Sequence, residues 1–265
     1  MDERPVDNTE RGSGPSVLDR REFLRRCWVA GAFVAIAQFD ATQGQPAEGA
    51  AYDATQYLYG MGVDVSKCIG CGRCMIACKT ENDVPPEPGF VRTWVERYVI
   101  HAEGEATVTA IEPGVEATGE ARPSERGILR TFFVPKLCNH CANAPCVQVC
   151  PVGATYTTQD GVVLVDRDYC LGCRYCIQAC PYGARFLHPE THTAEKCTFC
   201  YHRVVKGLVP ACVEVCPSGA RIFGDLRMRN SPLQRFTRFN EIQVLKGHLN
   251  TEPKVYYARL DREVS

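Results

Sequence analysis

The stretch CLGCRYCIQACP, residues 170–181, carries four cysteines at the spacing C-x2-C-x2-C-x3-C, and a proline follows the last of them. Three further tetrads repeat or vary this pattern, so that sixteen of the chain's seventeen cysteines belong to a tetrad. The first tetrad has the same spacing, the second widens its middle gap to four residues, and the fourth widens it to eleven. In chain order the tetrads are Cys68, Cys71, Cys74 and Cys78; Cys138, Cys141, Cys146 and Cys150; Cys170, Cys173, Cys176 and Cys180; and Cys197, Cys200, Cys212 and Cys216.

This spacing is that of bacterial ferredoxins, in which three cysteines bind one [4Fe–4S] cube and the fourth binds the neighbouring cube. The irons of a cube take thiolate ligands, and glycines such as Gly70 and Gly172 let the backbone curl around them. The sequence therefore predicts four [4Fe–4S] clusters, with all sixteen tetrad cysteines as ligands. Zinc sites and disulfides are the alternatives. Zinc ribbons rarely end in C-x3-C-P, and thiols crowded within a tetrad suit one metal centre better than bridges between distant segments.

Because the fourth cysteine of each tetrad binds the cube of another tetrad, the tetrads are expected to share ligands in pairs. Tetrads two and three are separated only by the strand-like run 161–166, as in a two-cluster ferredoxin. Tetrads one and four then pair around them, which predicts an α+β fold of two nested ferredoxin-like modules with extensive loops. The predicted ligand sets are Cys68, Cys71 and Cys74 with Cys216; Cys197, Cys200 and Cys212 with Cys78; Cys138, Cys141 and Cys146 with Cys180; and Cys170, Cys173 and Cys176 with Cys150.

The amino terminus predicts export. Arg20 and Arg21 precede Phe23-Leu24, which resembles a twin-arginine signal, and the apolar run 27–37 is too short to cross a bilayer, which takes about 20 apolar residues. This route carries folded cargo, and it suits a protein whose clusters are assembled in the cytoplasm. An uncleaved amphipathic anchor is the alternative. We expect a periplasmic or otherwise extracytoplasmic protein that is exported in the folded state.

The remaining chain is divided by composition and strand patterns. We expect a signal peptide at 1–39, a linker at 40–59, a four-cluster domain at 60–225 and a C-terminal docking tail at 226–265. Strands are predicted at 59–65, 90–100 and 128–134, with a surface loop or hairpin at 101–126 between the last two.

No catalytic residue is predicted. The chain lacks a dinucleotide-binding G-x-G-x-x-G, a P-loop and an H-E-x-x-H motif, and every tetrad is complete, so no cube offers a substrate an open iron. The net charge is −1 and basic residues are dispersed, which argues against nucleic-acid binding. His140 is expected to lie in a cluster loop. Several basic residues adjoin cysteines and are expected to raise cluster potentials, namely Lys67, Arg73, Lys79, Lys136, Arg174 and Lys196.

Residues 60 to about 225 resemble the four-cluster electron-transfer subunit of the dimethyl sulfoxide reductase superfamily. The resemblance is carried by VDVSKCIGC at 63–71, CNHC at 138–141 and PACVEVCPSGAR at 210–221. The ending EPKVYY at 252–257 is similar to that of exported members, such as the polysulfide and tetrathionate reductase subunits.

The resemblance implies a non-catalytic subunit of an oxidoreductase complex. It would relay electrons between a quinone-interacting integral membrane subunit and a molybdopterin oxidoreductase or multihaem cytochrome subunit, and would be membrane-associated through its partner. The alternatives are a free-standing periplasmic polyferredoxin and a reductase that acts at one cluster. The sequence does not identify the terminal substrate, the catalytic partner or the direction of electron flow.

Overall fold

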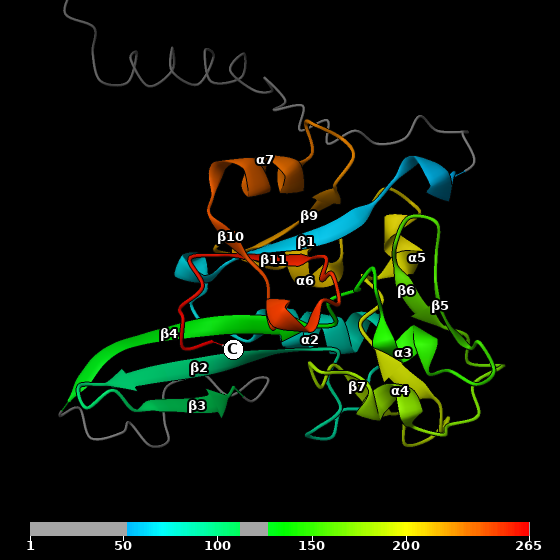
Figure 1. The fold of residues 1–265 in the computed structure, drawn as a ribbon, viewed down its shortest axis with the longest axis horizontal. Helices are drawn as coiled ribbons and strands as arrows, with labels where there is room; N and C mark the ends of the chain where they lie inside the picture. Colours follow the sequence, from blue (N-terminus) through cyan, green and yellow to red (C-terminus); the bar gives the residue numbers. More distant parts are fainter. Residues whose placement is uncertain (1–51, 112–126, 265) are drawn as a thin grey trace, which may run out of the picture. The chain divides into compact units, whose positions relative to one another are not determined.

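The computed structural model describes residues 52–111 and 127–264. The predicted signal peptide at 1–39, residues 40–51 of the predicted linker and residues 112–126 of the predicted loop lie outside the described residues. None of the described helices is long and apolar enough to cross a membrane. The α+β prediction is confirmed, because short helices and small sheets alternate along the chain with extended loops (Figure 1).

A four-stranded sheet joins the two ends of the described chain, in the order β10-β11-β1-β9 (Figure 1). β1 (Tyr59–Asp64) runs parallel to β11 (Val255–Ala258) and antiparallel to β9 (Arg221–Asp225). β10 (Ile242–Gln243) pairs antiparallel with the other edge of β11. The first strand of the domain is therefore held in the sheet by a strand from the C-terminal end.

The predicted strand at 59–65 exists as β1, but both of its faces are buried. One face is built from glycines that admit helix α7 (Pro232–Phe239), since a Cβ on Gly62 would lie 2.6 Å from the ring of Phe236. The opposite face carries apolar side chains such as Met61, which is fully buried in the core. Alternate residues of β1 therefore face helix α7 and the core, and neither face of the strand is exposed to solvent.

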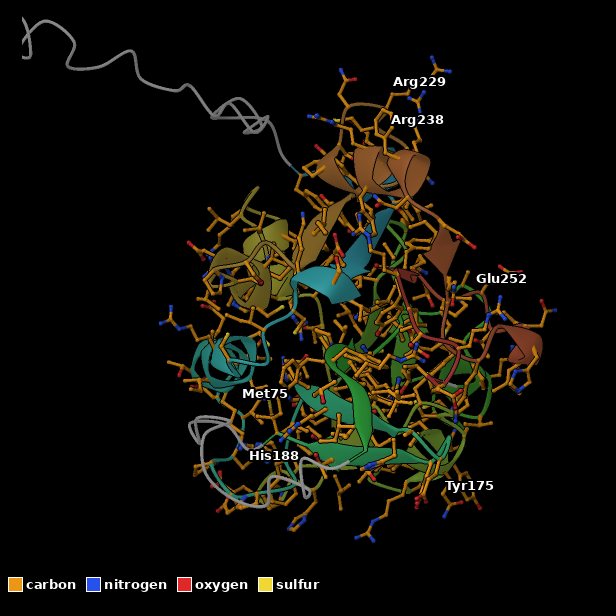
Figure 2. All side chains as sticks on the ribbon, turned by 90° about the vertical axis from the view of Figure 1, so that its left-hand side faces the viewer. Met75, Tyr175, His188, Arg229, Arg238 and Glu252 are labelled. Carbon is orange, nitrogen blue, oxygen red and sulfur yellow. The ribbon has the colours of Figure 1, made fainter. Side chains whose placement is uncertain are left out.

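The segment predicted as a C-terminal docking tail at 226–265 forms part of the fold over its described residues 226–264. It supplies α7, whose first turn is capped by the Ser231 side chain accepting a hydrogen bond from the Gln234 N–H at 3.1 Å. It also supplies β11, whose Tyr257 is fully buried and donates its hydroxyl hydrogen to the Pro135 carbonyl at 3.1 Å. Arg238, on the outer side of α7, extends away from the body (Figure 2).

The structure describes residues 52–59 of the predicted linker at 40–59. Its described part forms the short helix η1 (Ala54–Gln56) and a stack of rings in which Tyr57 lies 5.5 Å from Tyr52 and 5.4 Å from Tyr59. The Tyr52 hydroxyl donates to the buried carboxylate of Asp160. These contacts make residues 52–58 part of the domain.

A second sheet has the order β3-β2-β4 and is antiparallel throughout. β2 (Thr93–His101) and β4 (Ile128–Leu137) correspond to the strands predicted at 90–100 and 128–134. β3 (Ala106–Ala110) turns back from β2 as a hairpin, and all of its residues are exposed.

The helices that contain the tetrads pack in pairs, and these pairs follow the predicted nesting. α2 (Arg73–Glu81), from tetrad one, packs against α6 (Ala211–Glu214), from tetrad four. α3 (Pro145–Gln148), from tetrad two, packs against α4 (Tyr175–Gln178), from tetrad three. The remaining elements are the hairpin β5 (Thr155–Thr157) and β6 (Val163–Val165), the hairpin β7 (Arg185–Leu187) and β8 (Ala194–Lys196), α5 (Tyr201–Val204), η2 (Val65–Lys67) and η3 (Gly247–Leu249).

Candidate metal centres

The residue before the second cysteine of each tetrad has a left-handed backbone. In this conformation its N–H turns back toward the first cysteine, so that the His140 N–H donates to Cys138 Sγ at 3.5 Å. The Phe199 N–H donates in the same way to the Cys197 sulfur at 3.4 Å. Such bonds stabilise a negatively charged sulfur ligand. The four equivalent residues and their φ angles are Gly70 (69°), His140 (44°), Gly172 (67°) and Phe199 (54°).

Gly172 is expected to be indispensable at its position. An added Cβ would lie 2.3 Å from the His192 carbonyl oxygen, and the left-handed backbone alone costs a non-glycine residue about 1–2 kcal/mol. Gly172→Ala should therefore distort the third cysteine loop and lower the iron content of the purified protein. Gly183→Ala is the matched control, since Gly183 has a similar φ of 63° but its Cβ would meet nothing within 4 Å. Equal iron loss in both variants would show that backbone conformation, and not the clash, is responsible.

The structure gathers twelve of the tetrad cysteines around three pockets, each lined by four of them. Every pocket combines three cysteines of one tetrad with the last cysteine of another. The three groups are group A, Cys68, Cys71, Cys74 and Cys216; group C, Cys138, Cys141, Cys146 and Cys180; and group D, Cys150, Cys170, Cys173 and Cys176.

The remaining four cysteines form group B, which comprises Cys78, Cys197, Cys200 and Cys212. The Asn82 side-chain amide donates to both Cys78 Sγ, at 3.7 Å, and Cys200 Sγ, at 3.6 Å. Burial raises the pKa of Cys78 to about 12, and the thiolates of Cys212 and Cys200 add to this shift. All four cysteines of group B are buried.

These four groups coincide with the four ligand sets that the exchange rule predicts. That the sulfurs ligate iron stays a prediction. All sixteen cysteines in the described part of the chain are free thiols. Among the described residues, no three His, Cys, Asp or Glu side chains are arranged to hold a single metal ion. A [4Fe–4S] cube has four irons, and each iron is bound by one cysteine sulfur. A pocket surrounded by four cysteine sulfurs is therefore suited to hold one cube.

The loop after the last cysteine of a tetrad points backbone N–H groups at that cysteine. The Thr155 N–H lies 3.4 Å from Cys150 Sγ. Burial raises the pKa of Cys150, but these N–H groups outweigh burial and hold its pKa below the ordinary thiol value. Cys216 has a lowered pKa for the same reason, with the N–H groups of Arg221 and Ala220 among its donors. Both residues are therefore disposed to bind as thiolates.

The buried basic residues near the sulfurs are mostly not those named from the sequence. Of the six basic residues predicted to raise cluster potentials, only Lys196 is fully buried. Lys136 is instead paired with Glu96 at 2.7 Å. Sequence reasoning missed Arg185 and Arg221, which are buried against cysteine sulfurs. The signal that identifies them is the repeated C-P-x-G-A-R, at 180–185 and 216–221.

His140 lies in a cysteine loop, as expected, and its ring is completely buried. It stacks on Phe199, with ring centroids 3.7 Å apart, so the equivalent residues of tetrads two and four touch. Its Nδ1 accepts the Val163 N–H at 3.1 Å, which places the proton of the neutral ring on Nε2. Burial holds the pKa of His140 well below its usual value, and the charge of Lys196 lowers it further.

The aromatic side chains near the cysteines differ in exposure. Phe199 is fully buried and excludes water, as expected for a ring that shields a metal site. Tyr175, by contrast, has 59% of its surface exposed and points outward (Figure 2). Cys176, the next residue in the chain, is nevertheless buried.

Comparison with known proteins agrees with these sites. Two family models, both described as a 4Fe-4S dicluster domain, match residues 67–154 and 129–226. One subunit of the tetrathionate reductase of Salmonella typhimurium is 41% identical over 208 residues, which is 78% of this chain and 74% of that protein. A tetrathionate reductase subunit of Archaeoglobus fulgidus is 45% identical over 198 residues, 75% of this chain and 80% of that protein. One chain of the polysulfide reductase of Wolinella succinogenes is 37% identical over 199 residues, 75% of this chain and 92% of that protein.

Proposed function

The chain belongs to the iron–sulfur electron-transfer subunits of dimethyl sulfoxide reductase-type complexes, and on that basis we propose that it holds four [4Fe–4S] clusters as a relay between two partner subunits. A [4Fe–4S] cluster supplies a site that takes up and releases one electron. The observation that carries the proposal is that the fold gathers the sixteen cysteines into four groups of four, one group for each proposed cluster.

Shared elements and packing support the row A–B–C–D: α2 carries both Cys74 of group A and Cys78 of group B, the loop rings His140 and Phe199 stack between groups C and B, and α3 of group C packs against α4 of group D. The thiolates of neighbouring groups also shift one another's pKa values. Burial raises the pKa of Cys212, in group B, to about 11, and the thiolate of Cys74, in group A, adds to this shift. Burial also raises the pKa of Cys197, and Cys138 of group C contributes. The pKa of Cys176, in group D, is likewise raised, first by burial and also by Cys146 of group C. Each group therefore interacts with the next one in the row.

The two ends of the row are the groups that reach the surface. Cys71 of group A and Cys173 of group D are exposed. An apolar side chain stands at the equivalent position beside each of them, Ile69 with 60% and Leu171 with 71% of its surface exposed. Exposed apolar side chains next to a surface cysteine suit a partner surface that excludes water. Groups A and D are thus the proposed points of electron entry and exit.

The partners are proposed from the class of the relatives. Their names describe single subunits or chains of a tetrathionate or polysulfide reductase, which supports assembly in a multi-subunit complex. We assign one end of the row to a quinone-interacting integral membrane subunit. The other end is assigned to a molybdopterin oxidoreductase or multihaem cytochrome subunit.

The first test is the iron and acid-labile sulfide content of anaerobically purified protein, combined with low-temperature EPR of the reduced sample. We expect about sixteen irons per chain, four for each group, and signals from interacting clusters. Isolation in the presence of membranes should recover the chain in stoichiometric amounts with a membrane protein. Zinc, or four to eight irons without interacting signals, would contradict the four-cluster relay. Recovery only as a soluble monomer would favour a free-standing polyferredoxin, and turnover by the isolated chain would favour a reductase.

We propose export of the folded chain by the twin-arginine route, supported by Arg20-Arg21 before Phe23-Leu24 and by the need to insert clusters before export. Replacing both arginines by lysine keeps the charge but removes the guanidinium pair. The variant should accumulate in the cytoplasm with its iron, as measured by cell fractionation and immunoblotting. Lysine at Arg25 and Arg26 is the matched control and should leave export unchanged. Unaltered export of the Arg20/Arg21 variant would exclude this route.

A further inference from the structure

Each junction between neighbouring cysteine groups contains a buried cation. Arg221 lies between groups A and B, Lys196 between groups B and C, and Arg185 between groups C and D. The proposed relay does not itself require a buried cation at each junction, because exposed basic residues beside the cysteines would balance the negative charge of the clusters to the same extent.

Arg221 lines the pocket of group A and contacts a sulfur of group B. Its Nη1 lies 3.8 Å from Cys212 Sγ, and its Nη2 donates to Thr93 Oγ1 at 2.7 Å, which fixes the guanidinium. Burial would lower the pKa of Arg221, but the thiolates of Cys74 and Cys212 outweigh burial and raise it. The side chain is therefore a fixed positive charge shared by two groups.

Arg185 repeats this arrangement between groups C and D. Its Nη2 donates to Cys146 Sγ at 3.0 Å, and its Nη1 donates to Thr155 Oγ1 at 3.4 Å. Burial would lower the pKa of Arg185, and the thiolates of Cys146 and of Cys176, in group D, are among those that raise it. Both arginines occupy the same place in the repeat, five residues after the last cysteine of a tetrad.

Lys196 occupies the middle junction. Its Nζ donates to the carbonyl of Val163, which lines the pocket of group C, and to the carbonyl of Cys197 of group B at 2.7 Å. Burial lowers the pKa of Lys196, and the thiolate of Cys138 of group C opposes that shift. Thus two arginines from the repeat and one lysine before Cys197 cover all three junctions.

The two arginines are not neutralised by carboxylates. Arg92 is equally buried, but it pairs with Glu195 at 2.8 Å, so its charge is cancelled locally. Arg185 and Arg221 form no ion pair with any carboxylate in the described part of the chain; their contacts are cysteine sulfurs and threonine hydroxyls. Their charge remains available to the metal centres on either side.

We propose that Arg221, Lys196 and Arg185 are positioning charges that each set the reduction potentials of the two clusters flanking them. Reduction adds one electron, and hence one negative charge, to a centre that already carries four thiolates. A buried cation stabilises that added charge, and its effect is large because the surrounding dielectric constant is low. A cation shared by two centres favours reduction of both, which keeps neighbouring potentials close enough for transfer in either direction.

The test is a potentiometric titration followed by EPR on the purified chain with its clusters. Arg221→Gln should lower the midpoint potentials of two of the four components, and Arg185→Gln should lower those of the other two. We expect at least a tenfold drop in each equilibrium constant for reduction, which is about 59 mV for a one-electron couple. Lys196→Gln should affect one component from each pair. The double arginine variant should lower all four potentials.

The matched controls are exposed arginines of the same repeats. Arg73→Gln for group A and Arg174→Gln for group D remove charges that also line the pockets of these groups but are exposed to solvent. Because the solvent screens these exposed charges, the clusters of both control variants should keep the midpoint potentials of the unaltered chain. An equal shift of all four components by one arginine variant, or no shift in a variant that keeps its iron, would overturn the proposal. So would control variants that shift as much as the buried ones.

If the Gln variants lose iron, the Arg221→Lys and Arg185→Lys variants are titrated in their place. These substitutions keep the positive charge but change the shape of the hydrogen-bond donor. Lysine variants with wild-type potentials support the charge role. Lysine variants with lowered potentials, or without iron, would assign the arginines a purely structural role and overturn it. The inference rests on the proposed function; if the unaltered chain holds fewer than about sixteen irons, the proposed function itself fails before any variant is compared.

Discussion

Cys78→Ser should remove the cluster assigned to group B and leave the cluster of group A in place, although Cys78 belongs to the first tetrad. Cys78 is buried beside Cys200 and Cys212, and Asn82 joins Cys78 and Cys200 through hydrogen bonds to both sulfurs. A serine hydroxyl is a poor ligand for a cube iron compared with a thiolate. The expected loss is about four irons per chain, or about one if a three-iron cluster is retained.

The decisive comparison is between EPR difference spectra. The Cys78→Ser and Cys197→Ser variants should lose the same signal, because both residues belong to group B. The Cys78→Ser and Cys74→Ser variants should lose different signals, even though both residues come from tetrad one. Identical losses in the last two variants would contradict the exchange of the fourth cysteine. Cys27→Ser is the control, since Cys27 lies outside all four tetrads and its replacement should leave the iron content unchanged.

The cysteine groups were predictable from the sequence because local spacing shows which cysteine of each tetrad binds the neighbouring cluster. The spacing within each tetrad, the rule that the fourth cysteine binds the neighbouring cluster, and the adjacency of tetrads two and three are together sufficient to assign all four groups. The left-handed backbone was also predictable at Gly70 and Gly172, where glycine signals it. It was not predictable at His140 and Phe199, which occupy the same position with large side chains and contact one another.

Other features depend on contacts between distant segments, so no local pattern revealed them. The pairing of β1 with β11 joins residues far apart in the chain, as in Met61 opposite Val255, and it places a sheet strand within the segment predicted as a docking tail. The buried cations do have a local signal, the repeated C-P-x-G-A-R at 180–185 and 216–221, but their position between two cysteine groups depends on contacts that the sequence alone does not show. Proximity in sequence to a cysteine selected exposed residues such as Arg73 and Arg174, whereas Arg185 and Arg221 are buried because the loop after each tetrad folds back between two groups.

Anaerobic removal of iron should unfold the inner module while leaving the β2–β4 pairing largely intact. The inner module is built from helices of four residues, α3 and α4, and from hairpins of three-residue strands, β5–β6 and β7–β8. Elements this short are not stable alone, since an isolated helix needs about 12–15 residues and a two-stranded hairpin is marginal. The metal centres must therefore supply most of the stability of this module.

The second sheet differs in the physical property that matters, which is strand length. β2 has nine residues and β4 has ten, and Val95 and Val134 are buried in the core between them and the rest of the domain. Amide hydrogen exchange after chelation should show near-complete loss of protection in β5–β8 and retention in β2 and β4. Reconstitution with iron and sulfide should restore the protection of β5–β8. Unchanged exchange in these hairpins would mean that side-chain packing, and not ligation, holds the inner module together, because the two sources of stability respond differently to loss of the metal.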